Sequence, residues 1–290
     1  MRYMKKSLNV FFVSNSTCYY FTDELMGLLD AAGYENVTLA LVYASGCSIE
    51  KHHRWLQTGY PGYQFRVLTP GGLEIIEECT LEKALGHANW DVISFDNNAR
   101  SFASGDARTA LSLTEPYFGE LYNHIRQKFP NAKYYWHQVW ANEIGYQLAF
   151  KMETIEQRTC VYRAKRAVME HMVKTYDIGG IPTGDAWEMV RDMELFTRPV
   201  APFLDAERFS LCSRIVKEVF RDDYTHDGDI GGGQYLNACV WFEMLTGESC
   251  LENSFRPVYK LGDTDCSLTE EKITVLQNAA HRAVKAWLKT

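Results

Sequence analysis

The sequence predicts an α/β fold in which helices cover both faces of a mostly parallel central sheet. Over the first two thirds of the chain, short apolar runs typical of buried strands alternate with segments of helical spacing. A helix between two strands returns the chain to the same end of the sheet, so such strands pair in parallel. Polar residues follow several of these runs, at the edge where an α/β sheet binds its ligands.

Five apolar or aromatic runs define the expected parallel strands. They are Val10–Val13, Val37–Val42, Trp90–Phe95, Lys133–Gln138 and the short Ile178–Gly184 with its exit. Between the second and third runs, Pro70-Gly71-Gly72 is a turn signal that joins the arms Phe65–Leu68 and Leu73–Ile76. This pattern predicts a small hairpin.

Several of the expected helices begin at a capping serine or threonine or end at glycine or proline. They are a segment ending near Ala32, then Ile49–Gln57, Thr80–Leu85, Glu115–Phe129, Thr154–Tyr176, Asp185–Met193, Glu207–Phe220 and Gln234–Thr246. The chain has no internal repeat, low-complexity tract or linker. Residues 1–290 are therefore expected to form a single domain.

Charge and composition restrict the class of partner. Thirty Lys and Arg against 37 Asp and Glu give a net charge of −7, which disfavours nonspecific binding to nucleic acid or to an anionic membrane. A small molecule or a neutral polymer such as a glycan is the expected partner. Aromatic residues make up 13% of the chain, and their flat rings can also form surfaces for sugars.

The eight cysteines are scattered, without a C-x-x-C pair or metal-ligand spacing, so we expect buried free thiols, no metal and no cofactor. Free thiols are typical of a reducing compartment. The basic N-terminus resembles the start of a signal peptide, but its apolar run is too short and leads directly into the candidate active turn. These features predict a cytoplasmic location.

The stretch Leu8 to Leu25 contains the first candidate site residue. A buried strand breaks into Ser14-Asn15-Ser16-Thr17, and a helix follows. A serine at this strand end can present its hydroxyl beside the unpaired N–H groups of the next helix. Ser16 is therefore our candidate nucleophile. The alternative is that Ser16 is a helix cap or a polar loop residue.

The second candidate site lies far downstream. Asp223 and His226 are three residues apart in a predicted loop, a spacing that lets a carboxylate fix the tautomer of an imidazole and leave its other nitrogen as a base. Together with a strand-end serine, this pair completes a Ser/His/Asp constellation. The following Gly231-Gly232-Gly233 either permits close backbone packing or cradles an anion.

These residues resemble the SGNH (GDSL-type) hydrolase superfamily, and within it the DUF4886 branch. The resemblance runs from Val10 to about Gly247. Its matching segments are Ser14-Asn15-Ser16, Gly46 to His52, the end of Trp90–Phe95, Trp136 to Ala141, Ile181 to Gly184, the Asp223/His226 pair and Gly233 to Gly247. The resemblance implies a three-layer α/β/α, flavodoxin-like fold.

The resemblance also implies roles for individual residues. Ser16 would be the nucleophile, His226 the base and Asp223 its orienting acid. The oxyanion would be held by the backbone N–H groups of Ser16 and Gly46 and by a side-chain amide, for which we select Asn97. Asn15, His137 and Trp140 are the expected substrate contacts at the carboxyl edge of the sheet.

The chain departs from the family pattern at three places. Ser14 stands where a glycine is usual, and Asp96-Asn97-Asn98 replaces Gly-x-Asn-Asp. Asn98 is therefore an alternative to Asn97, and an Asp96 side chain directed at the oxyanion would repel it. The interval after His226 is longer, so Asp227 is an alternative to Asp223 as the orienting acid.

The combined interpretation is a serine esterase that cleaves a small acyl ester, for example acetyl on a carbohydrate, through an acyl-enzyme. The alternative is a protein of the same fold that binds a glycan or other small ligand with little or no catalysis, because Ser14 and Asp96 alter the oxyanion region. His52 and His53 are expected at the surface, and Trp136 and Trp241 in the core.

Overall fold

The computed structural model describes residues 6–147, 150–196, 210–217, 219–222 and 226–290. Its main sheet has seven strands in the order β4-β3-β2-β1-β5-β6-β7. Strands β1, β2, β5, β6 and β7 are parallel, and β3 and β4 form the expected antiparallel hairpin at one edge. Their bounds are Lys6–Val13 (β1), Tyr34–Tyr43 (β2), Tyr63–Thr69 (β3), Gly72–Cys79 (β4), Val92–Phe95 (β5), Lys133–His137 (β6) and Gly179–Ile181 (β7).

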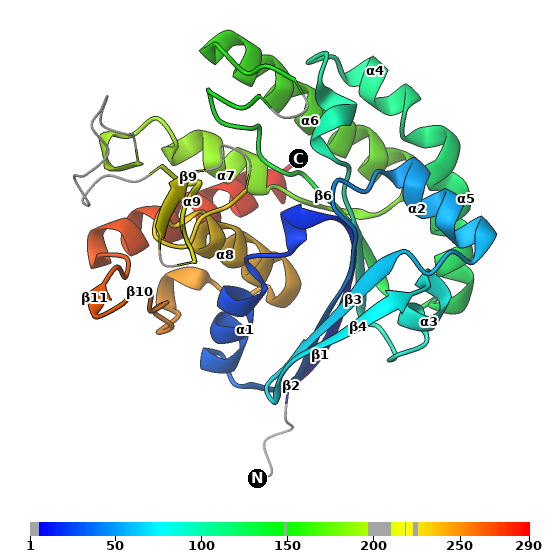
Figure 1. Ribbon diagram of the computed structural model, residues 1–290, viewed down its shortest axis with the longest axis horizontal. Helices are drawn as coiled ribbons and strands as arrows, with labels where there is room; N and C mark the ends of the chain where they lie inside the picture. The colour runs from blue at the N-terminus through cyan, green and yellow to red at the C-terminus, as the bar shows by residue number, and fades with distance from the viewer. Residues whose placement is uncertain (1–5, 148–149, 197–209, 218, 223–225) are drawn as a thin grey trace.

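Helices cover both faces of this sheet (Figure 1). One face is covered by α1 (Thr22–Ala31), α7 (Thr183–Val190), α8 (Gly233–Thr246) and α9 (Glu270–Trp287). The other is covered by α2 (Ile49–Thr58), α3 (Leu81–Leu85), α4 (Ala107–Ser112), α5 (Glu115–Lys128) and α6 (Ile155–Tyr176). The predicted three-layer α/β/α architecture is therefore confirmed.

Side chains of β1 alternate between the two cores, as expected for a central strand. Phe12 packs against Trp241 of α8, with ring centroids 5.0 Å apart, whereas Phe11 packs against Trp90 on the opposite face at 4.9 Å. Trp136 and Trp241 are buried, which confirms their assignment to the core. His52, in contrast, is fully buried and bonded to the hydroxyl of Tyr63, so its predicted surface position was wrong.

The last third of the chain differs from the prediction. The expected helix Glu207–Phe220 is wrong, because its described part contains the antiparallel strands β8 (Ser213–Val216) and β9 (Val219–Asp222). Lys217, with φ of 49°, lies in the turn between them. A further helix, α9, was not predicted: it begins after the Thr269 cap and packs on α8. None of the helices in the described residues is long and apolar enough to cross a membrane.

Glycines allow the segment that follows His226 to pack closely against residues 210–213. A Cβ on Gly231 would lie 1.9 Å from the carbonyl oxygen of Ser210, and one on Gly228 equally close to that of Ser213. The backbones themselves are in contact, since Gly228 N–H donates to Leu211 O at 2.8 Å. The glycine run thus permits close packing, the first of the two interpretations given above.

Gly231→Ala should lower the free energy of unfolding by about 3 kcal/mol, because backbone atoms must move to admit the methyl group. Gly71→Ala is the matched control, since a Cβ there meets only the Thr69 hydroxyl at 3.5 Å. Urea unfolding of both variants measures the difference. Equal stability of the two variants would contradict the packing described here.

Candidate active site

The turn that holds Ser16 follows β1 at the carboxyl edge of the sheet. Ser16 opens a short 3-10 helix (Ser16–Cys18), and its N-cap is Asn15, whose side chain accepts from the Thr17 N–H at 3.2 Å. Ser16 is therefore not the cap. It is half-buried, and no described residue hydrogen-bonds to its hydroxyl. The local fold thus leaves the Ser16 hydroxyl without a hydrogen bond to the described part of the chain.

The buried carboxylate of Asp96 fixes this turn from the end of the neighbouring strand. Val13 of β1 pairs with Phe95 of β5, which brings the next residues, Ser14 and Asp96, side by side. Asp96 accepts hydrogen bonds from Ser14 Oγ at 2.5 Å, Thr17 Oγ1 at 2.6 Å and Asn15 Nδ2 at 3.2 Å. Ser14 and Asp96, which both depart from the family pattern, are therefore hydrogen-bonded to each other. Both carboxylate oxygens of Asp96 accept from residues of the turn.

The predicted substrate contacts His137 and Trp140 lie beneath this turn. Both are 1% exposed, and Trp140 stacks on Trp187 with centroids 4.5 Å apart. They form the floor of the site, so the structure does not bring them to a substrate surface. Asn15 is also buried and joins the turns after β1 and β2, since its Nδ2 lies 3.4 Å from Cys47 O.

The tautomer of His137 follows from its neighbours. The Thr183 hydroxyl donates to Gln138 O at 2.6 Å, so it accepts from His137 Nε2 at 2.7 Å. Burial lowers the pKa of His137, and Nδ1 of the neutral ring then faces the Cys18 thiol at 3.6 Å. His137 thus acts as a neutral part of the floor. Its partners Thr183 and Cys18 come from two separate segments, which no sequence spacing indicated.

Gly46 and the two asparagines after β5 lie beside the nucleophile turn. Gly46 is exposed, with φ of 56°. Asn97 turns toward α4 and α5, where its Nδ2 donates to Thr114 Oγ1 at 2.5 Å. Asn98 instead donates to Gly46 O at 2.9 Å. The structure therefore places Asn98, the alternative residue, next to the candidate oxyanion glycine, and does not place the selected Asn97 there.

His226 approaches the turn from the other end of the sequence. Its half-buried ring packs edge-on against that of Tyr20, with centroids 5.2 Å apart. Asp223 lies outside the described residues. Asp227 is fully buried, and its Oδ2 accepts from Asn237 Nδ2 at 3.0 Å. Asn237 also accepts from Trp187 Nε1 at 2.7 Å, which ties this segment to α7 and α8.

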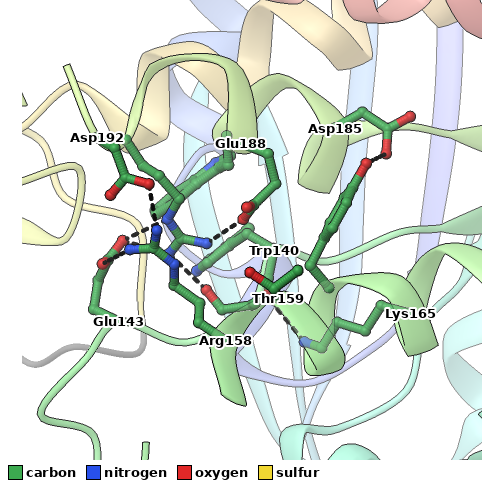
Figure 2. Close-up of polar contacts among 12 residues, drawn as sticks. Trp140, Glu143, Arg158, Thr159, Lys165, Asp185, Glu188 and Asp192 are labelled. Carbon is green, nitrogen blue, oxygen red and sulfur yellow. Dashed lines mark hydrogen bonds and ion pairs between the residues drawn. The ribbon is translucent and has the colours of Figure 1, made fainter. Parts of the chain in front are cut away.

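An ionic network that the sequence analysis missed holds the segment after β6. Arg191 of α7 is buried between Glu143 and Glu188 and donates to Ala141 O at 2.8 Å. Figure 2 shows Glu143 and Asp192 turned toward Arg158 of α6. The network joins this segment to α6 and α7 beside the site floor.

Lys165 of α6 is buried in the same region. Its Nζ donates to Trp140 O at 2.8 Å (Figure 2), and burial lowers its pKa to about 7. Lys165, Asn97 and His137 line a cavity of about 10 Å³, which is too small for a substrate. Lys165 therefore supports the segment that carries Trp140.

Comparison with known proteins gives a family and a fold. The profile of a domain of unknown function, DUF4886, matches residues 12–179. A DUF4886 family protein from Bacteroides uniformis is 23% identical, with a TM-score of 0.73 over 97% of this chain and 95% of that one. A Parabacteroides merdae protein described as a GDSL-like lipase is 10% identical, with a TM-score of 0.50 over 84% and 97%. No curated protein matches the chain.

Arg191→Met should lower the free energy of unfolding by about 3 kcal/mol, because Glu143 and Glu188 lose their shared buried cation. The exposed Arg282→Met serves as control and should change stability by less than about 0.5 kcal/mol. Denaturant titrations compare the two. A loss as small as that of the control would mean that the network contributes little to stability.

Lys165→Met should alter the pH dependence of stability. Because the folded-state pKa of Lys165 is depressed to about 7, the unfolded chain binds more protons between pH 7 and its ordinary value of 10.5. This lysine therefore makes stability rise with pH across that window. The stability of the native protein minus that of the variant, measured by urea unfolding from pH 6.5 to 10, should increase. A constant difference would contradict the depressed pKa.

Proposed function

This chain belongs to the DUF4886 family, an SGNH-like branch of the α/β/α folds, and on that premise we propose that it is a serine esterase with Ser16 as nucleophile. The observation that carries the proposal is the Ser16 hydroxyl, half-buried at the carboxyl edge and without a described hydrogen-bond partner, in a turn fixed by Asp96. The neighbouring side chains of Ser14 and Thr17 are hydrogen-bonded to Asp96, so the turn does not depend on the Ser16 hydroxyl for its stability.

The proposed base comes from the opposite end of the chain. Tyr20, four residues after Ser16, packs on His226, which supports a role for this imidazole in accepting the Ser16 proton. Asp223 is proposed to orient the ring. A carboxylate there would fix the tautomer and stabilise the imidazolium that forms.

The proposed reaction is acyl transfer through an acyl-enzyme. As His226 takes its proton, Ser16 Oγ attacks the ester carbonyl, and the resulting oxyanion accepts from the N–H groups of Ser16 and Gly46. The position of Asn98 beside Gly46 supports it over Asn97 as the third donor. His226 then protonates the leaving alcohol, and water releases the acid by the same steps in reverse.

A ligand-binding protein without catalysis is the less supported alternative. The argument for such a protein is that Ser14 and Asp96 would disturb the region that holds the oxyanion. Asp96 instead accepts three hydrogen bonds from the turn, and Ser14 supplies one of them. The Asp96 oxygens are thus engaged by hydrogen-bond donors of the turn, which weakens the argument for a protein without catalysis.

Ser16→Ala should abolish hydrolysis of p-nitrophenyl acetate while changing the free energy of unfolding by less than about 1 kcal/mol. His226→Ala should reduce kcat/KM by about 10³-fold, because the members of such a triad act as a unit. Ser104→Ala, in an exposed loop, is the matched control and should retain full activity.

A fluorophosphonate probe followed by mass spectrometry gives a second readout of the same proposal. We expect one adduct, on Ser16, that is lost in His226→Ala. Retained turnover in Ser16→Ala, or an adduct on another serine, would refute the assignment.

A further inference from the structure

Three tyrosines and two arginines border the turn of Ser16, and we call them the tyrosine–arginine rim. They are Tyr19, Tyr20, Tyr43 at the end of β2, Arg66 on β3 and Arg214 on β8, and all five are half-buried. The Tyr19 ring lies 4.7 Å from that of Tyr20 and 5.0 Å from that of Tyr43. Tyr19 N–H also donates to Ser16 O at 3.2 Å, so the rim is continuous with the nucleophile turn.

Arg66 is held on the rim by neutral groups. Its guanidinium carbon lies 3.9 Å from the centroid of the Tyr19 ring. Its Nη1 donates to the Tyr19 hydroxyl at 2.9 Å and to Gln64 Oε1 at 3.2 Å. Gln64 is oriented in turn by Glu77, which accepts from its Nε2 at 2.7 Å. Among the described residues, neutral hydrogen-bond acceptors and a ring thus hold the guanidinium in place.

Among the described residues, no carboxylate forms an ion pair with Arg66. The half-buried or buried arginines of α6 and α7, in contrast, all have acidic partners: Arg158, Arg166 and Arg191. Asp23 interacts electrostatically with Arg66 but lies beyond ion-pair distance, and burial raises the pKa of Asp23. No described residue accepts a hydrogen bond from Arg66 Nε or Nη2.

A partly desolvated guanidinium without a carboxylate favours an anionic ligand, because its remaining N–H donors match two oxygens at once. The rings beside it favour the flat face of a sugar. Arg214 lies 4.9 Å from the centroid of Tyr20, the ring that also packs against His226.

We propose that the tyrosine–arginine rim binds a carboxylate-bearing sugar, so that the substrate is an acyl ester on a saccharide containing uronic acid. The sugar stacks on the tyrosines, and its carboxylate pairs with Arg66. This inference names the substrate class and rests on the proposed esterase function. It makes Arg66 a specificity residue that takes no part in the acyl-transfer steps.

Binding of sugars that carry no ester to hydrolyse tests the tyrosine–arginine rim directly. Oligosaccharides of galacturonate and of glucuronate, without acyl groups, are titrated calorimetrically against the intact protein, with galactose and glucose oligosaccharides of equal length as neutral counterparts. We expect at least one acidic sugar to bind about tenfold more tightly than its counterpart, with a preference that falls as salt is raised. No preference for either acidic sugar would overturn the proposal.

Arg66→Gln should remove this preference and leave the neutral sugars within about twofold, whereas Arg66→Lys should retain part of it. Arg282→Gln, an exposed arginine on α9, loses the same charge and should bind as the native protein does. Thermal melting checks that each variant is folded. An acidic preference that survives in Arg66→Gln would refute the role of this residue.

Kinetics separate this inference from the esterase assignment. With an O-acetylated uronate, Arg66→Gln should raise KM about tenfold and change kcat by less than about twofold, since Arg66 touches the bound sugar and not the reacting carbonyl. Acid-selective binding with retained turnover in Ser16→Ala would refute the nucleophile and keep the rim. Labelling of Ser16 by the fluorophosphonate probe without a preference for acidic sugars would support the nucleophile and refute the role of the rim.

Discussion

The candidate site depends on one buried carboxylate. Asp96 accepts from Ser14, Asn15 and Thr17, and so a single side chain from β5 fixes the path of the turn after β1. The cost of burying its charge is offset by these charge-assisted hydrogen bonds. Parallel pairing of β1 with β5 is the precondition, because it places the two strand ends at the same height. The register between β1 and β5 therefore determines the geometry of the candidate site.

Beneath the turn, hydrogen bonds continue without a break into the helices. His137 contacts Thr183, Thr183 bonds to Gln138, and the Gln138 amide donates to Asp185 Oδ1 at 2.8 Å. Asp185 in turn pairs with Arg166 of α6. A floor built this way holds the residues above it in fixed positions, which acyl transfer requires of an oxyanion site. The ionic network around Arg191 extends the same support to the segment after β6.

Much of the fold could be predicted from local pattern, since the apolar runs of central strands and the Pro-Gly-Gly turn are strong signals. The hairpin β8–β9 could not, because Lys and Glu favour a helix locally and only pairing between the strands overrides them. The loops that form the candidate site could be predicted, but the directions of individual side chains within them could not. Asn97 and Asn98 are identical side chains one position apart, and the direction of each depends on Thr114 and Gly46, which lie far away in sequence.

The two halves of the candidate site are anchored by different parts of the chain. The side chains that bond to one another in the turn of Ser16 follow β1 and β5, whereas the segment after His226 is held by residues 210–213 and by Asn237 of α8. During synthesis, the nucleophile turn and Asp96 thus leave the ribosome long before the base is made. In a ribosome-bound chain, the proposed nucleophile and the proposed base would therefore come together only after α8 had docked on the sheet.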